Sequence, residues 1–242
     1  MRVFSYWTDG FRGANTWKPQ LGVDQWTARM PDYRLFSDAD VVPLLSLWGK
    51  EAARLFEEIR IPACRSDVAR LVLLREFGGL YVDMHCAPGD CNKLSLVFDK
   101  LASCDLVIFD ESFYSTIDRH TAILNGVLAA RPATEILDQL ISAALVNLAA
   151  HRSAENAAGQ AHVAYDIYKL TGPWMIWHEL FRRTENGGEL RPEYSDRVTL
   201  WPIDGDCEDQ PVLTDRHNGY RRGDDHWTAR QKTECLFGEP QP

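Results

Sequence analysis

Two side chains that can bind a metal ion, Asp83 and His85, stand one residue apart after a short apolar stretch. A carboxylate suits Mg²⁺ or Mn²⁺, and a single imidazole shifts the preference toward Mn²⁺. Such a cation commonly takes one or two protein ligands and completes its shell with the phosphate oxygens of a bound molecule. The spacing therefore predicts a Mn²⁺ or Mg²⁺ site that serves a phosphorylated ligand.

The residues before this pair predict a helix that ends in a glycine turn. Ser66 is a candidate N-cap, and apolar residues at helical spacing continue the predicted helix to about Phe77. Asp67 and Arg70 are three residues apart, so both project from one side of this helix near its start. The glycine pair 78–79 can then supply the positive φ that commonly ends a helix.

An alternating strand is predicted directly after the glycines. Over residues 80–85, Tyr81, Asp83 and His85 point to one side and apolar residues point to the other. Ligands of α/β sheets collect at the carboxyl ends of strands, and Asp83 lies at such an end. The sequence thus predicts an aromatic ring, a carboxylate and an imidazole on one face of a strand end.

The rest of the chain alternates predicted strands with predicted helices. Strands are expected at residues 2–7, 105–110 and 197–203, and helices at 41–59, 133–151 and 164–183. The last helix is interrupted at Thr-Gly-Pro, where we expect Thr171 to cap the second piece and Pro173 to lie in its first turn. Strands that alternate with helices predict a layered α/β fold, and the lack of repeats or linkers favours one domain.

The composition excludes some classes of protein. The formal net charge of the 242 residues is -9, which argues against nonspecific binding to nucleic acid, because that needs a basic surface. No run of about 18 apolar residues is present, so no transmembrane segment is expected. The first residues, MRVFSYWTDG, do not resemble a signal peptide, because polar residues appear before any apolar region develops. We therefore expect a soluble, cytoplasmic protein.

The stretch from Ser66 to His85 resembles a known family. Seven residues are in register with the pattern of a glycosyltransferase family whose sugar-binding region contains the DXD motif: Ser66, Asp67, Arg70, Gly78, Gly79, Tyr81 and Asp83. This family includes capsular and Golgi-type enzymes, and the clostridial glucosylating toxins carry a similar arrangement. His85 departs from the pattern, which has a second Asp there. An Asp-x-His followed by Cys also occurs in the polypeptide N-acetylgalactosaminyltransferases, where it still binds Mn²⁺.

Further segments are compatible with the same family. By this resemblance, Trp7 would lie beside the nucleotide base and Asn125 would approach the donor sugar. The Thr-Gly-Pro at residues 171–173 resembles a segment near the sugar and acceptor pocket. His226 and Trp227 resemble a C-terminal His-Trp element that closes over the metal and diphosphate, although the usual second Trp is absent.

The resemblance implies a GT-A type, Rossmann-like α/β fold with a mixed, mainly parallel sheet. It implies a single domain over residues 1–242, with residues 204–242 closing over the site. The implied activity is that of a metal-dependent glycosyltransferase, a hexosyltransferase that moves a sugar from a nucleotide-sugar to a saccharide, glycolipid or protein acceptor with retention of configuration. A UDP-sugar is favoured over GDP-mannose as the donor, and a role in polysaccharide biosynthesis is implied by the same family.

The implied site residues fall into overlapping groups. The catalytic residues would be Asp67, Arg70, Asp83 and Asn125. The nucleotide-sugar would be bound by Trp7, Asp67, Arg70, Tyr81, Asp83 and Trp227. The metal ligands would be Asp83, His85 and His226. A further acidic group near the anomeric carbon could come from Asp110 or Glu111, at the end of a predicted strand.

Two other functions are compatible with these residues. A metal-dependent nucleotide-sugar hydrolase or phosphodiesterase would use Asp83 and His85 to activate water. Such enzymes usually show a second close cluster of His and Asp, which the sequence lacks. A non-catalytic sugar-nucleotide binder, degenerate at His85, would bind with little dependence on metal. The intact set of Asp67, Arg70 and Asp83 favours an active transferase over this binder.

Overall fold

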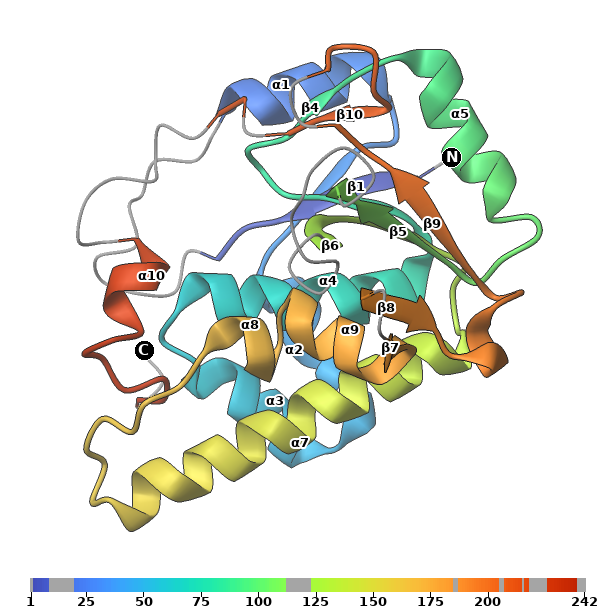
Figure 1. Cartoon of the computed structure of the whole chain (residues 1–242). Helices are drawn as coiled ribbons and strands as arrows, with labels where there is room; N and C mark the ends of the chain where they lie inside the picture. Colours follow the sequence, from blue (N-terminus) through green and yellow to red (C-terminus); the bar gives the residue numbers. More distant parts are fainter. Residues whose placement is uncertain are drawn as a thin grey trace.

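A six-stranded sheet forms the centre of the fold (Figure 1). The structure is a computed structural model that describes residues 2–8, 20–111, 123–184, 187–204, 207–214, 216–217 and 226–238. The strand order is β2-β1-β3-β6-β5-β9. In chain order the strands are β1 (Val3–Tyr6), β2 (Arg34–Phe36), β3 (Gly79–Val82), β5 (Leu106–Asp110), β6 (Ile123–Ala130) and β9 (Val198–Pro202). Strand β6 runs antiparallel to β3 and β5, and the other pairs are parallel. The prediction of an α/β fold with a mixed, mainly parallel sheet is therefore confirmed.

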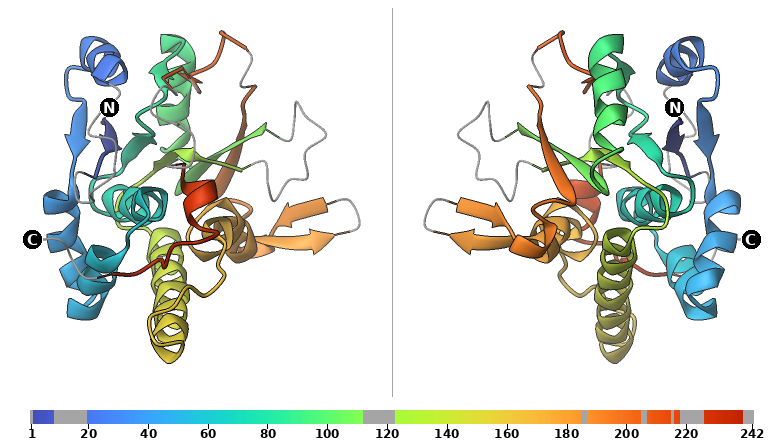
Figure 2. Two further views of the ribbon diagram at one scale, coloured as in Figure 1. Left: turned by 90° about the vertical axis from the view of Figure 1, so that its left-hand side faces the viewer. Right: turned by 90° about the vertical axis from the view of Figure 1, so that its right-hand side faces the viewer.

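Helices cover both faces of this sheet (Figure 2). One face is covered by α2 (Asp38–Leu45), α3 (Lys50–Glu58), α4 (Pro62–Phe77), α7 (Glu135–Ala157), α8 (Ile167–Leu170) and α9 (Pro173–Leu180). The other face is covered by α1 (Gln20–Arg29) and α5 (Cys91–Lys100). Among the helices that the structure describes, none is both long and apolar enough to cross a membrane.

Smaller elements complete the fold. Strand β4 (Ala87–Pro88) pairs with β10 (Val212–Leu213), and β7 (Phe181–Thr184) forms a hairpin with β8 (Gly187–Leu190) that projects from the body (Figure 2). Short 3-10 turns lie at Ser46–Trp48 and Pro192–Tyr194, and α10 is the short helix Trp227–Arg230.

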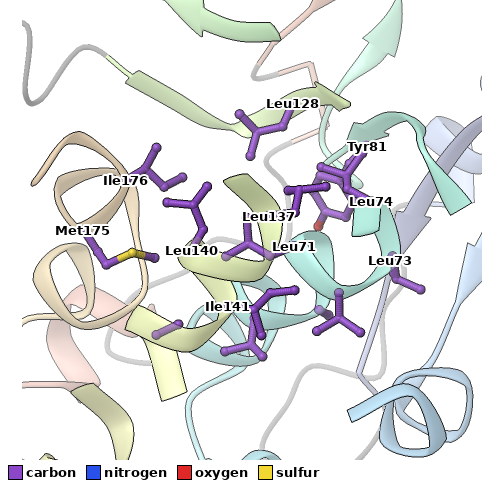
Figure 3. Close-up of a cluster of buried hydrophobic side chains, with 14 of the residues drawn as sticks. Leu71, Leu73, Leu74, Tyr81, Leu128, Leu137, Leu140, Ile141, Met175 and Ile176 are labelled. Atoms are coloured by element: carbon purple, nitrogen blue, oxygen red, sulfur yellow. The ribbon is translucent and has the colours of Figure 1, made fainter. Parts of the chain in front are cut away.

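Alternation along β3 divides its side chains between two apolar clusters. Tyr81 packs on the face covered by α4, α7 and α9, in the apolar cluster that also contains Leu71, Leu74 and Leu137 (Figure 3). Leu80 and Val82 pack on the opposite face, with residues of α1 and α5. Because α4 is buried along most of its length, its polar side chains on the same face are held in fixed positions inside the protein.

The prediction of one helix over residues 41–59 is wrong. The structure has two helices there, α2 and α3, separated by a 3-10 turn and by Gly49. Gly49 has φ 113°, a conformation that residues with a Cβ rarely adopt, so the helix is interrupted at this point. Leu47, which completes the apolar spacing in the sequence, lies in the turn and is 75% exposed.

Helix α4 begins earlier than predicted. Its first residue is Pro62 and its N-cap is Ile61, so Ser66 lies inside the helix. Proline is favoured at this position because its fixed φ suits a helix and the N–H that it lacks has no partner there. The end of the helix is as predicted, since Gly78 has φ 58° and Gly79 has φ 106°.

Strand β3 ends at Val82, before the predicted end. Residues 83–86 form a turn, closed by a hydrogen bond of 2.9 Å from the Cys86 N–H to the Asp83 carbonyl. Asp83 lies at the carboxyl end of the strand, as predicted, although it directly follows β3 and is not part of it. His85 lies in the turn instead, so strand alternation does not place its side chain on the face of Asp83.

The helix predicted over residues 164–183 is interrupted where the sequence indicates. Helices α8 and α9 are separated by Thr171 and Gly172, and α9 begins at Pro173 as predicted. The prediction that Thr171 caps α9 is wrong, because Gly172 is the N-cap and the Thr171 hydroxyl donates to Asp67. After α9 the chain continues as the strand β7.

Candidate functional site

One buried arginine, Arg70 of α4, joins three elements at the carboxyl end of β3. Its side chain is 4% exposed. Nη1 donates to Asp67 Oδ1 at 2.6 Å, and Nη2 donates to Asp83 Oδ1 at 3.1 Å. Nη1 also donates to Asn125 Oδ1. The guanidinium thus links α4 to the end of β3 and to β6, and it brings the four residues predicted as catalytic into one hydrogen-bond network.

Asp67 accepts hydrogen bonds from three side chains of this network. Besides Arg70, the donors are Asn125 Nδ2, at 3.0 Å from Oδ1, and Thr171 Oγ1, at 3.0 Å from Oδ2. Burial raises the pKa of Asp67, and the Arg70 guanidinium opposes this shift. Since Thr171 comes from the turn between α8 and α9, the network also connects these helices to α4.

Asp83 is the acidic residue of the network that reaches the surface. Its side chain is 24% exposed, whereas that of Asp67 is 8% exposed. Oδ1 of Asp83 accepts from the Tyr81 hydroxyl at 2.7 Å as well as from Arg70. Oδ2 lies beside Gly126 of β6, where a Cβ would come within 2.8 Å of it. One oxygen of Asp83 is therefore fixed by two donors, and the other lies against a glycine.

The charges in the network stabilise one another. Burial alone would lower the pKa of Arg70, but the carboxylates of Asp83 and Asp67 raise it above its usual value. Burial, and then the Asp83 carboxylate, raise the pKa of Tyr81 well above its usual value. Tyr81 is therefore protonated at neutral pH and can donate to Asp83.

The histidines predicted as metal ligands lie on separate segments. His85 is buried, and its carbonyl accepts from the N–H groups of Arg216 at 3.0 Å and His217 at 3.2 Å. His226 is the N-cap of α10, and its Nδ1 lies 2.7 Å from Thr228 Oγ1. Within the described ranges, no three His, Cys, Asp or Glu side chains are grouped so that they could hold a metal ion.

The residues at the end of β3 nevertheless fit a cation that has few protein ligands. Asp83 offers a partly exposed carboxylate, and His85 follows in the same turn. Gly126 leaves the space beside Asp83 Oδ2 unfilled by any Cβ. One or two protein ligands are enough where the oxygens of a diphosphate complete the shell.

The tryptophans predicted to bind the nucleotide lie on separate elements, one after β1 and one in α10. Trp7 is half-buried directly after β1, and its N–H donates to the Phe36 carbonyl at 2.9 Å. Trp227, the first residue of α10, packs edge-on against Tyr168 of α8, with ring centroids 5.3 Å apart. Helix α8 leads into the Thr-Gly-Pro turn that contacts Asp67.

The C-terminal segment is attached to the body at several described points. Strand β10 pairs with β4, residues 216–217 bond to the turn after β3, and α10 packs on α8. Residues 205–206, 215, 218–225 and 239–242 of this segment lie outside the described part of the chain. Of the two additional acidic candidates, Asp110 is the last residue of β5 and is fully buried, and Glu111 follows it.

Two residues that contact the network were not among the predicted site residues. The resemblance places the Thr-Gly-Pro segment near the sugar pocket, but Thr171 is predicted only as a helix cap, whereas its hydroxyl bonds to Asp67. Gly126 has no side chain, yet its position beside Asp83 determines where that carboxylate can lie. The indication in the sequence is the Asn-Gly pair at 125–126, because a glycine in a strand often marks a close approach by another group.

Comparison with protein families finds a match to the sugar-binding region. Residues 6–93 match the model described as "Glycosyltransferase sugar-binding region containing DXD motif". The matched residues include Trp7, Asp67, Arg70, Tyr81, Asp83 and His85. The resemblance predicted from the sequence is thus confirmed over residues 6–93, which match the sugar-binding region of a glycosyltransferase family.

Two solved structures are similar to parts of the chain. One is the PaToxG glycosyltransferase, with 13% identity and a TM-score of 0.41 over 74% of this chain and 68% of that one. The other is the ligand-free glycosyltransferase domain of the YGT toxin, with 13% identity and a TM-score of 0.33 over 60% of this chain and 44% of that one. No curated protein matches the sequence.

Proposed function

We propose that the chain transfers a sugar from a nucleotide-sugar, a UDP-sugar rather than GDP-mannose, to a saccharide, glycolipid or protein acceptor with retention of configuration. The observation that supports this most directly is the Arg70 network. It joins Asp67 and Asp83, which lie within the segment that matches a sugar-binding region, to Asn125 of β6 beside the end of β3. A cytoplasmic location and a role in polysaccharide biosynthesis stay predictions.

In this proposal the network orients the donor sugar. Asp67, Arg70 and Asn125 present amide, guanidinium and carboxylate groups that can exchange hydrogen bonds with sugar hydroxyls. Arg70 holds Asp83 on one side and Asp67 on the other, so a ligand that contacts Asp83 meets a group whose position is already fixed. Preorganisation of this kind lowers the barrier, because little reorganisation remains to be done during the reaction.

The nucleotide would be held by aromatic residues on either side of the network. Trp7 would stack on the base, and Trp227 would cover the diphosphate from α10. Tyr81 would line the site, with its hydroxyl bonded to Asp83. Trp7 lies at the end of β1, a usual position for nucleotide binding in α/β sheets.

A divalent cation, Mn²⁺ or Mg²⁺, would be held by Asp83 and His85, with His226 as a third ligand from the C-terminal segment. When bound, such a cation would neutralise the charge that develops on the departing diphosphate. The residues of the chain itself would orient the sugar and the nucleotide around that position.

The test is release of nucleotide from a panel of UDP- and GDP-sugars with Mn²⁺, in wild type, Asp83→Ala and Asp99→Ala. Asp99 is an exposed residue of α5 and is the matched control. We expect slow, Mn²⁺-dependent release from one donor, lowered at least about a hundredfold by Asp83→Ala and unchanged by Asp99→Ala.

Other outcomes would identify the competing functions. Fast release with water as the sole acceptor would indicate a nucleotide-sugar hydrolase. Binding of UDP or GDP that does not depend on Mn²⁺, without release from any donor, would indicate a non-catalytic binder. If the protein neither bound UDP or GDP nor released nucleotide from any donor, that result would contradict the proposed function.

A further inference from the structure

A second polar cluster lies at the carboxyl ends of β1 and β2, centred on Asp38. Asp38 is the first residue of α2, and three side chains donate to its carboxylate. Thr8 Oγ1 and Arg65 Nη1 each donate to Oδ2 at 2.7 Å, and the Tyr6 hydroxyl donates to Oδ1. Asp38 therefore connects the end of β1 to the start of α2 and to α4.

Arg65 fixes this carboxylate from inside the protein. Its side chain is 6% exposed. Besides Asp38, it donates through Nε to the Ile59 carbonyl at 2.7 Å and through Nη2 to the Glu57 carbonyl at 2.6 Å. A guanidinium held by two backbone carbonyls has little freedom to move, and it compensates the charge of Asp38.

The two other donors to Asp38 stand on either side of Trp7. Tyr6 precedes this tryptophan and Thr8 follows it, and both are buried. Burial, and then the Asp38 carboxylate, raise the pKa of Tyr6 well above its usual value, so its hydroxyl keeps its proton at neutral pH. The backbone around Trp7 is thus anchored at three consecutive residues. Tyr6 and Thr8 bond to Asp38 through their side chains, and the Trp7 N–H donates to the Phe36 carbonyl.

Helix α4 supports both clusters with arginines five residues apart. Arg65 holds Asp38 beside the end of β1, and Arg70 holds Asp83 at the end of β3. The same buried helix therefore sets the position of Trp7, through Asp38, and the position of the Asp83 carboxylate. In the proposed function, Trp7 contacts the base of the nucleotide-sugar and Asp83 lies at its diphosphate, so the helix positions two contacts to one ligand.

We propose that Asp38, held by Arg65, is a positioning residue that fixes the indole of Trp7 as the platform on which the nucleotide base stacks. This inference rests on the proposed function. An indole offers a planar apolar face to any base, and stacking of this kind makes a large contribution to nucleotide affinity. A platform that is fixed before the ligand arrives loses little conformational freedom on binding, and affinity rises accordingly.

The test compares a ligand that has a base with one that lacks it. UDP and inorganic pyrophosphate are titrated by calorimetry, each with Mn²⁺, into wild type, Asp38→Asn and Thr8→Val. Thr8→Val removes one of the donors to Asp38 and keeps the shape of the side chain. Because Arg65 and Asp38 stay paired, no buried charge is left alone. UDP binding by this variant therefore tests the inference even if Asp38→Asn folds poorly. We expect a Kd for UDP about tenfold higher in both variants and an unchanged Kd for pyrophosphate.

Asp40→Asn is the matched control. Asp40 lies two residues away on α2, where it accepts from the Ser37 N–H at 2.9 Å and pairs with Arg34 at 2.7 Å. Its substitution removes the ion pair with Arg34 and weakens the acceptor of the Ser37 N–H, because an amide oxygen carries no charge, and it leaves the cluster at Asp38 untouched. The thermal midpoint should fall, and the Kd for UDP should stay at the wild-type value.

A double-mutant cycle with Trp7→Leu makes the assignment specific. If Asp38 acts through the indole, Thr8→Val should weaken UDP binding in wild type and have no further effect when Trp7 is absent. An equal loss for UDP and pyrophosphate would show a general structural role, and an unchanged Kd for UDP would show no role. Either result overturns the inference while the proposed function stands. Absence of UDP binding by wild type would overturn both.

Discussion

Gly126 of β6 lies directly against the carboxylate of Asp83. The Asp83 N–H donates to the Gly126 carbonyl at 2.7 Å, and a Cβ at position 126 would come within 2.8 Å of Asp83 Oδ2. Gly126 is not among the glycines with positive φ, so the position requires a glycine for space and not for backbone conformation.

Gly126→Ala should therefore displace the Asp83 carboxylate and leave the fold intact. A shift of about 1 Å in a group that orients substrate can lower activity about a hundredfold, and we expect a fall of that order in kcat/KM. The control is Gly159→Ala, where no atom lies within 4 Å but φ is 69°. That substitution should cost about 1 kcal/mol of stability and leave kcat/KM unchanged. Full activity of Gly126→Ala would contradict the role given to Asp83.

Arg70→Lys should abolish most activity although the charge is kept. A lysine cannot bond simultaneously to Asp67, Asn125 and Asp83, because it lacks the planar fork of the guanidinium. We expect kcat/KM to fall about a hundredfold, and the free energy of unfolding to fall by about 1–3 kcal/mol, because buried acceptors lose their donor. Arg75→Lys, on the same helix but 34% exposed and paired with Asp138, should change neither quantity appreciably. Equal effects of both substitutions would argue against a special role for Arg70.

Thr171→Val should shift the pH dependence of activity, whereas Thr171→Ser should not. Burial already raises the pKa of Asp67, and the hydrogen bond from Thr171 acts to lower it. Removing that bond raises the pKa further. Since the ion pair of Asp67 with Arg70 needs the ionised carboxylate, the acid limb of the pH–rate profile should move to higher pH.

The stability of Thr171→Val should change with pH in a defined direction. A carboxyl whose pKa is higher in the folded state than in the unfolded state stabilises the fold at pH below the unfolded pKa. That stabilisation is lost as the pH rises through the folded pKa. The loss of stability in Thr171→Val should therefore be larger at neutral pH than in acid, as measured by urea unfolding across that range. A loss independent of pH would contradict this account of Asp67.

Glu155→Gln should loosen the C-terminal segment that carries α10. The buried carboxylate of Glu155 on α7 accepts from the N–H of Leu236 at 2.7 Å and of Phe237 at 3.1 Å. An amide can accept one of these bonds but opposes the other with its own N–H groups, so we expect a loss of about 1–3 kcal/mol. Amide hydrogen exchange at residues 236–237 should become faster. Glu135→Gln, on the same helix and 88% exposed, should leave exchange there unchanged.

The local pattern of the sequence was sufficient to predict much of the fold near the site. Apolar spacing indicated α4 and α7, the glycine pair indicated the end of α4, and short apolar runs indicated β1, β5 and β9. Two elements beside the site gave too little pattern for prediction. Strand β2 has three residues, and α1 has only two buried residues in ten. A break such as Gly49 was also missed, because apolar spacing continues across it.

The sequence by itself determined the register of Asp67, Arg70, Tyr81 and Asp83, because these residues lie within one helix, one turn and one strand whose geometry fixes their spacing. Only the tertiary structure decided what completes the site. Asn125 and Thr171 reach Asp67 from 58 and 104 residues away along the chain. Those contacts depend on β6 pairing with β3 and on α9 packing against α7, and helical or strand periodicity contains no information about such long-range pairing. The same holds for Asp38 and Arg65, whose contact exists because β2 lies beside β1 and α4 packs against β1.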